Sequence, residues 1–374
     1  MIIVQDRIEV AARDRAPLQA RLMKEYVPGA SGRGLAFVDA WVSPPFDLVD
    51  QPITLWLRWQ VADIPAWWAM RSAAGEPAVL AFWNSVAQLI VSRERRYLVG
   101  EPFSAGVSGS VVRAPEASWP EPIATAPFHV TPRGWRETAQ LYLLKDLHME
   151  SAPTAQKALE ATLAAASHEL PGVVASWIAA NYVADYGAGH FTWDILFPDR
   201  ESATAARKSS VWRDRIAPAL ASACERVCAL GLETVGAGLQ RPELAQGVKR
   251  TALFRALPST PAEQLERWER DLLEMPAHVT SILNWRLSRA VPLDWSSPNA
   301  SVGKRVGKND WSHVWEQEYD RLEGLTVDYM VHPHHWAHVD RWFDPESGSQ
   351  IIDTALCHAF SPLDRTILGR DARG

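Results

Sequence analysis

The sequence predicts an α+β protein made of three tandem ferredoxin-like (βαββαβ) units. Three observations support this fold class. Short segments with apolar residues at every second position alternate with helical patterns. The order strand, helix, strand, strand, helix, strand occurs three times. Pro-, Gly- and Ser-rich stretches separate the copies, so we expect repeats at 1–100, 136–238 and 247–365, with a linker at 101–135.

Each repeat supplies the same six elements in order. In the first repeat we expect strands at 2–10, 34–43, 52–60 and 93–99, a helix at 13–27 closed by Pro28-Gly29, and a broken helix at 63–91. In the second repeat we expect strands at 140–145, 173–183, 190–197 and 232–238, and helices at 153–167 and 199–229. In the third repeat we expect strands at 248–257, 279–287, 312–319 and 351–360, and helices at 261–273 and 320–343.

Two further details accompany this pattern. An aspartate follows each third strand and is a candidate cap for the next helix: Asp63, Asp199 and Asp320. A long connection at 290–309 separates the middle strands of the third repeat, and connections of that length are often functional.

The number of repeats predicts the assembly. The sheet of a ferredoxin-like unit is covered by helices on one face, so its other face must pack against a partner. Three repeats leave one sheet unpaired within the chain. We therefore expect a homodimer in which the odd repeat pairs with its equivalent in a second chain.

Composition excludes several classes of partner. The net charge of -6 provides no general attraction for nucleic acid or an anionic membrane. No stretch approaches the roughly 20 apolar residues that span a bilayer, and the N-terminal alternation reads as a strand, so we expect a cytoplasmic protein. Three cysteines provide no disulfide framework, and Cys224 and Cys228 fall on a helical pattern as reduced thiols.

Histidines are concentrated near the C-terminus. His332, His334, His335 and His338 follow Tyr329 within ten residues, and His313 precedes them on a predicted strand. Proline suits the first turn of a helix, so the His-Pro-x-His element predicts a helix that opens at Pro333 with His335 in its first turn. A helix N-terminus favours a neutral imidazole, which is the form that acts as a general base.

The third repeat resembles the Dabb family of stress-responsive dimeric α/β-barrel domains. The resemblance is carried by Val248-Lys249, Met275-Pro276-Ala277, residues 312–316 and residues 328–335, and is strongest to the olivetolic acid cyclase type. The first repeat, through residues 75–98, resembles NIPSNAP-type domains and has no histidine. We expect the first two repeats to be scaffold and the third to hold the site.

The resemblance implies a cofactor-independent lyase, cyclase or isomerase acting on a bulky aromatic or polyketide-like carbonyl compound. It implies that His335 is the general base, Tyr329 its hydrogen-bonding partner, and His313 and His332 further pocket histidines. Arg250 and Trp268 stand where such cyclases have a histidine and a tyrosine, so the substrate is expected to differ. The chain has 18 tryptophans, and we expect the pocket to be walled by Trp268, Trp311, Trp315 and Trp336.

Other interpretations remain open on the sequence. A protein that binds an apolar aromatic ligand or heme without catalysis would need the pocket but not a Tyr–His pair. An enzyme of the same dimeric α/β-barrel superfamily that depends on a metal or on heme is a third interpretation. A metal could bind His334 or His335 together with His338, with Asp340 or Glu346 as third ligand. No metal motif is present, and we expect no structural metal or other cofactor.

Overall fold

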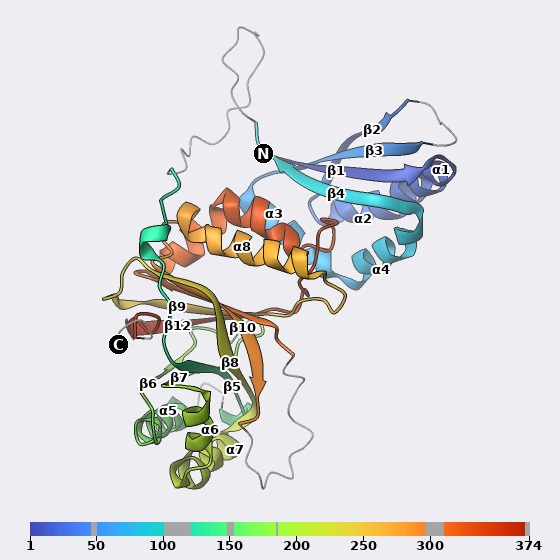
Figure 1. Cartoon of the computed structure of the whole chain (residues 1–374). Helices are drawn as coiled ribbons and strands as arrows, with labels where there is room; N and C mark the ends of the chain where they lie inside the picture. Colours follow the sequence, from blue (N-terminus) through green and yellow to red (C-terminus); the bar gives the residue numbers. More distant parts are fainter. Residues whose placement is uncertain (46–50, 101–120, 148–152, 185, 296–309, 371–374) are drawn as a thin grey trace. The chain divides into compact units, whose positions relative to one another are not determined.

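The computed structural model describes the chain except for residues 46–50, 101–120, 148–152, 185, 296–309 and 371–374 (Figure 1). Much of the predicted linker and most of the long connection at 290–309 lie outside the described residues. The chain divides into two compact units. The first contains Met1–Pro120 with Val331–Thr354, and the second contains Glu121–Met330 with Ala355–Gly374.

The first unit contains a four-stranded antiparallel sheet in the order β2-β3-β1-β4. In β1, alternate residues are buried, as the period-two pattern predicts. The strands are β1 (Ile2–Ala11), β2 (Ala36–Ser43), β3 (Pro52–Val61) and β4 (Ile90–Leu98). The helical segments are α1 (Ala12–Arg21), η1 (Leu22–Tyr26), α2 (Val27–Gly32), α3 (Ile64–Ser72), η2 (Ala73–Gly75), α4 (Pro77–Val86), η3 (Ala87–Leu89), η8 (His334–Val339) and η9 (Asp340–Trp342).

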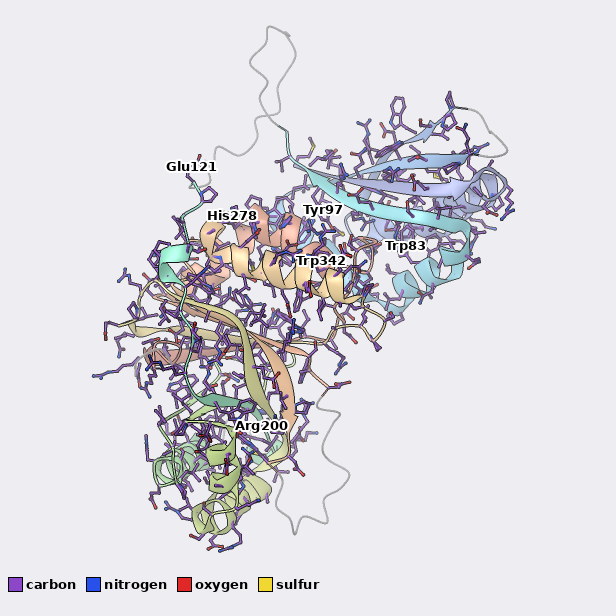
Figure 2. All side chains as sticks on the ribbon, in the orientation of Figure 1. Trp83, Tyr97, Glu121, Arg200, His278 and Trp342 are labelled. Atoms are coloured by element: carbon purple, nitrogen blue, oxygen red, sulfur yellow. The ribbon has the colours of Figure 1, made fainter. Side chains whose placement is uncertain are left out.

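Residues 331–354 pack against the first sheet, although they come from the third predicted repeat. Trp336 joins the core formed by the strands and helices of the first repeat. Trp83 of α4 and Tyr97 of β4, both labelled in Figure 2, each donate a hydrogen bond to a carboxylate of this segment. The predicted boundary at residue 247 therefore does not separate all of the third repeat from the first.

The second unit contains an eight-stranded antiparallel sheet in the order β12-β9-β11-β10-β8-β5-β7-β6 (Figure 1). The strands are β5 (Trp135–Leu143), β6 (Ala175–Ala180), β7 (Phe191–Phe197), β8 (Cys224–Leu239), β9 (Ala245–Phe254), β10 (Asn284–Leu293), β11 (His313–Tyr319) and β12 (Cys357–Arg365). The helical segments are η4 (Ala126–Phe128), η5 (Lys145–Leu147), α5 (Pro153–His168), α6 (Arg200–Arg207), η6 (Trp212–Ile216), α7 (Ala217–Ala223), α8 (Ala262–His278) and η7 (Gly324–Tyr329).

The eight-stranded sheet curls into a nearly closed barrel. Its two outermost strands approach each other through the chain that follows β6: Tyr182 N–H donates to the carbonyl of Phe360 at 2.8 Å, and His358 N–H donates to the carbonyl of Tyr186 at 3.0 Å. In each of the three four-stranded groups, the fourth, first, third and second strands lie side by side in that order. The α+β class with antiparallel sheets is confirmed.

Several predicted boundaries are wrong. Cys224 and Cys228 lie in strand β8 and not in a helix, because α7 ends at Ala223 and the following 16 residues pair with β5 on one side and β10 on the other. The first-repeat helical region does not end at Pro28-Gly29 but continues through Gly32, since proline in the first turn of α2 loses no helical hydrogen bond.

Two strands of the third repeat begin later than predicted. β10 starts at Asn284 instead of residue 279, and β12 starts at Cys357 instead of residue 351. Both proposed caps in the first two repeats are confirmed: Asp63 accepts from Ala66 N–H at 2.8 Å, and Asp199 accepts from Ser202 N–H at 2.7 Å. Asp320 is followed by a turn residue before the helix begins.

The barrel interior is lined by paired charges. Lys249 on β9 contacts Asp194 on β7 at 2.7 Å and Glu316 on β11 at 2.9 Å, and Arg136 on β5 also pairs with Glu316. β9 and β7 are not neighbours in the sheet, nor are β5 and β11, so the Lys249–Asp194 and Arg136–Glu316 contacts cross the barrel. The Lys249–Glu316 contact joins adjacent strands. Although burial lowers the pKa of Lys249, the two carboxylates outweigh it and the pKa is raised.

Glycines allow the close approach of two tryptophans to β8. A Cβ atom on Gly238 would lie 2.1 Å from Cζ2 of Trp285, and one on Gly231 would lie 2.1 Å from Cζ2 of Trp135. Trp285 is directly opposite Gly238 in the β10–β8 pair, so its indole lies over the glycine.

We predict that Gly238→Ala lowers the free energy of unfolding by about 1–3 kcal/mol, because the added methyl overpacks a rigid indole. Urea unfolding followed by circular dichroism measures the change. Gly32→Ala is the matched control, since a Cβ there has no neighbour within 4 Å. An equal effect of the two substitutions would contradict this account of Gly238.

Candidate functional site

The candidate site lies on one face of β9, β11 and β12 in the second unit. We call this the helix-side face, because Trp268 of α8 packs on it with its ring 4.8 Å from that of His313. Strand register places Gln317 opposite Arg250 and Trp315 opposite Ala252, so these side chains share the face. The charged barrel interior is on the opposite face of the same strands.

Arg250 is the centre of the polar contacts on this face. Its Nη1 donates to Oε1 of Gln317 at 2.6 Å and to the phenolic oxygen of Tyr329 at 3.1 Å. Its Nη2 lies 3.4 Å from Nε2 of His358, and the guanidinium carbon lies 5.0 Å from the centre of the Tyr329 ring. Arg250 is 4% exposed and Tyr329 is 3% exposed, so these contacts are shielded from water.

Three polar atoms in a row on β11 have no hydrogen-bond partner among the residues that the structure describes. They are Nε1 of Trp315, Nε2 of Gln317 and the hydroxyl of Tyr319, and all three side chains are fully buried. Burial raises the pKa of the Tyr319 phenol well above its usual value, so the hydroxyl keeps its proton. Each of these groups can donate a hydrogen bond, and an unmet buried donor is costly.

His313 lies at the start of the same strand and is held by neighbours within the unit. Its Nε2 is 3.0 Å from Oε1 of Glu269, and its Nδ1 is 2.9 Å from the Ser312 hydroxyl. Arg289 forms two bonds to the same carboxylate, at 2.9 and 3.0 Å. Because both ring nitrogens are engaged, the geometry favours an orienting role for His313 over that of a free base.

The other predicted histidines belong to the first unit. The ring of His335 lies 5.0 Å from that of Trp68 of α3. The backbone N–H of His335 donates to the backbone carbonyl of His332 at 2.9 Å. The predicted helix start is confirmed, since η8 follows Pro333 directly. Nδ1 of His332 accepts from His334 N–H at 3.1 Å, so this imidazole caps the new helix. The predicted convergence of His335 with Tyr329 stays a prediction, because they belong to different units.

The tryptophans predicted as walls have different surroundings. Trp268 and Trp315 are fully buried on the helix-side face. Trp311 packs instead with the cluster that contains Leu253 and Val314, whose side chains point into the barrel, so it does not share the side of His313. Trp336 is buried in the first unit, with its ring 5.5 Å from that of Trp67.

The carboxylates suggested as third metal ligands already have partners. Asp340 pairs with Arg71 at 2.5 Å, and Glu346 pairs with Arg33 at 2.9 Å and Arg95 at 3.1 Å. Burial opposes ionisation of Glu346, but the two arginines outweigh it and hold its pKa below the usual range. In Asp340 burial prevails and raises the pKa to about 6.

The two histidines suggested for that metal site are close together. The rings of His334 and His338 are 5.0 Å apart, and Nδ1 of His338 lies 2.9 Å from a guanidinium nitrogen of Arg341. Among the residues that the structure describes, no group of three or more histidine, cysteine or acidic side chains is placed to hold a metal ion.

A small cavity adjoins the paired charges of the barrel interior. A cavity of about 10 Å³, lined in part by Arg136, Trp177, Asp194 and Arg370, has space for one water molecule. In the described parts of the chain, no helix is long and apolar enough to cross a membrane.

Sequence reasoning missed four residues of this face: Glu269, Gln317, Tyr319 and His358. Gln317 and Tyr319 continue the period-two alternation that begins at His313 and Trp315, so that signal was present in the sequence. Glu269 follows the predicted wall residue Trp268 on the helix. His358 could not be placed, since its strand begins six residues later than predicted.

Comparisons with known proteins give matches among solved structures alone. No family model matches the chain, and no curated protein matches it. Among solved structures, the chain is similar to an anthrone oxidase-like protein, with 11% identity and a TM-score of 0.42 over 64% of this chain and 93% of that one.

Two further structures share this similarity at lower scores. A putative monooxygenase from Lactobacillus acidophilus has 9% identity and a TM-score of 0.36, over 62% of this chain and 94% of its own. A NIPSNAP domain protein from Burkholderia xenovorans has 18% identity and a TM-score of 0.23, over 28% of this chain and 100% of its own.

We predict a specific acid sensitivity for Glu269. Burial raises the pKa of its carboxyl, but the bonds from His313 and Arg289 outweigh burial and lower it from 4.5 to about 2. A lowered pKa in the folded state stabilises the protein fully above pH 4.5, and this contribution is lost as the pH falls toward 2. Glu269→Gln should therefore destabilise the protein at pH 6, and the difference from the native chain should shrink between pH 4.5 and 2.

Urea unfolding at a series of pH values measures this difference. Glu274→Gln, an exposed position on the same helix, is the matched control. A difference that stays constant from pH 6 to pH 2 would contradict the assignment.

Proposed function

We propose that the chain is a cofactor-independent acid–base enzyme of the lyase, cyclase or isomerase type, acting on the carbonyl group of an aromatic or polyketide-like compound. The observation that carries the proposal is the buried hydrogen bond from Arg250 to the phenolic oxygen of Tyr329. A phenol whose oxygen accepts a hydrogen bond from a guanidinium becomes a stronger hydrogen-bond donor through its own proton.

The role of Tyr329 follows from this contact. When a proton leaves the carbon beside a carbonyl group, charge develops on the carbonyl oxygen, and a buried phenol can donate a hydrogen bond to it. In a site shielded from water, such a donor stabilises the developing negative charge more than it would in water. The base is proposed to be His335, as predicted from its position in the first turn of a helix, with His332 as an orienting group.

A second candidate is a binding protein without catalysis. It is favoured by the engagement of both nitrogens of His313, which leaves that residue a structural role. The two candidates differ in what the tyrosine does. Binding alone requires the shape of Tyr329, whereas catalysis requires its hydroxyl.

We predict that Tyr329→Phe and His335→Ala each lower turnover by a factor of about 100 while leaving the fold intact. A suitable reaction is exchange of the benzylic protons of phenylacetone in D₂O, followed by proton NMR. Tyr182→Phe, at a half-exposed tyrosine of the same unit, is the control and should not change the rate.

Exchange of the phenylacetone protons by the native chain at the uncatalysed rate would contradict the enzyme proposal for this class of ketone. Unchanged exchange in Tyr329→Phe would remove the phenol from the mechanism and leave the guanidinium as the remaining oxyanion donor.

We also propose that the chain consists of three tandem ferredoxin-like units and assembles as a homodimer through the first sheet. The recurring strand order supports the repeats. On the sheet face opposite the core, Trp41 pairs with Trp56 across β2 and β3, and Trp41 is 62% exposed. Beside them, Arg58 donates to Asp39 at 2.7 Å, so the face combines apolar rings with both signs of charge.

We predict that light scattering at micromolar concentration gives about twice the chain mass of 41.6 kDa. Trp41→Glu should shift the protein to the monomer, because a carboxylate would be buried between two sheets. A monomeric native chain would contradict the proposed assembly.

A further inference from the structure

Arg250 is a buried cation without a counter-ion. It is 4% exposed, and its contacts are the carboxamide of Gln317, the phenol of Tyr329 and the imidazole of His358. Within the described parts of the chain, no carboxylate pairs with it. Burying an unpaired charge is expensive, and a bound anion would offset this cost.

Other buried arginines of this chain are treated differently. Arg71 pairs with Asp340 at 2.5 Å, Arg95 pairs with Asp6 at 2.7 Å, and Arg136 pairs with Glu316. These three buried guanidinium groups, in both units, are thus paired with carboxylates. Arg250 differs from them, because among the described residues no carboxylate pairs with it.

The unpartnered groups near Arg250 are all of one kind. The side-chain oxygen of Gln317 accepts a hydrogen bond from Arg250. The amide nitrogen of Gln317, which is a donor, has no partner among the described residues. The Tyr319 hydroxyl and the Trp315 indole N–H are also donors without partners. One cation and three donors form the complement of a ligand that offers only acceptors and carries negative charge.

Aromatic side chains surround these donors. Phe360 on β12 is directly opposite Arg250, and Tyr329 places its ring below the guanidinium. Trp315 is next to Gln317 on the same face of β11. A flat ring bearing the anion would therefore meet apolar surface, while its oxygens meet the donors.

We propose that the helix-side face of β9 and β11 is a binding site for an aromatic oxyanion, either a carboxylate or an enolate, with Arg250 as its counter-ion and Gln317, Tyr319 and Trp315 as hydrogen-bond donors. This deepens the proposed function, on which it rests for the identity of the site, by naming the charge that the substrate carries. These side chains are buried, and Gly324 at the start of η7 lies beside the Tyr319 ring, so a ligand reaches them when the chain around Gly324 moves aside.

The test compares two ligands of the same shape. 2-Naphthoate carries the anion, and 2-naphthamide is its neutral counterpart. Quenching of tryptophan fluorescence should show that the native chain binds naphthoate at least about tenfold more tightly than naphthamide. Arg250→Met should remove this preference, while its melting temperature without ligand stays within a few degrees of the native value.

The matched control for the lost charge is Arg255→Met. Arg255 follows β9 and pairs with Asp310 at 2.6 Å, so its removal should leave the preference for naphthoate unchanged. A preference that survives in Arg250→Met, or one that is equally lost in Arg255→Met, would overturn the proposal, since the selectivity would then come from general charge.

A second variant keeps the test valid if Arg250→Met does not fold. Tyr319→Phe removes an unpartnered hydroxyl, so it should keep or raise the melting temperature of the free protein and weaken naphthoate binding several-fold. Tyr26→Phe is its control in the first unit, because the Tyr26 hydroxyl bonds Glu346 and its loss should lower the melting temperature. Unchanged naphthoate binding in Tyr319→Phe would mean that the ligand does not bond to this hydroxyl, which contradicts the proposal.

Binding and proton exchange separate the two proposals. Selective naphthoate binding without any exchange of phenylacetone protons would support the anion site and reject catalysis. Exchange without selectivity between naphthoate and naphthamide would support catalysis and reject the anion site.

Discussion

Pairing of β8 with strands on both sides holds the second unit together. β8 is 16 residues long and pairs with β5 along its first half and with β10 along its second half. Without this strand, the sheet would separate into a group of four strands and a group of three. Because the joined sheet curls, residues that are far apart in the sheet meet across the interior, and buried charges can be paired there without leaving the unit.

The curled sheet gives its two faces different chemistry. The interior holds cations and carboxylates in contact. On the helix-side face, among the described residues, a cation lies without a carboxylate partner beside a row of donors without acceptors. An anion bound as we propose would supply partners for these groups.

Two regions of the histidine-rich segment have separate structural tasks. Tyr329 ends η7 and contacts Arg250 in the second unit, whereas the chain from residue 331 packs into the core of the first unit through Trp336. Glu346 then anchors this segment, since Arg33 and Arg95 both bond to its carboxylate. The segment thus stabilises the first unit, whatever the role of His335 in chemistry.

The sequence alone determined the class of fold, the order of the strands along the chain, the caps at Asp63 and Asp199 and the helix start at Pro333, because each depends on contacts between near neighbours. It also marked His313, Trp315 and Arg250 as residues of one region. It misplaced β10, β12 and the cysteine-containing strand, whose ends are set by pairing with distant strands. Only the tertiary structure decided that Arg250 has no carboxylate, that Glu269 holds His313, and that residues 331–354 join the first sheet, because these facts depend on which side chains from distant segments come to lie beside one another.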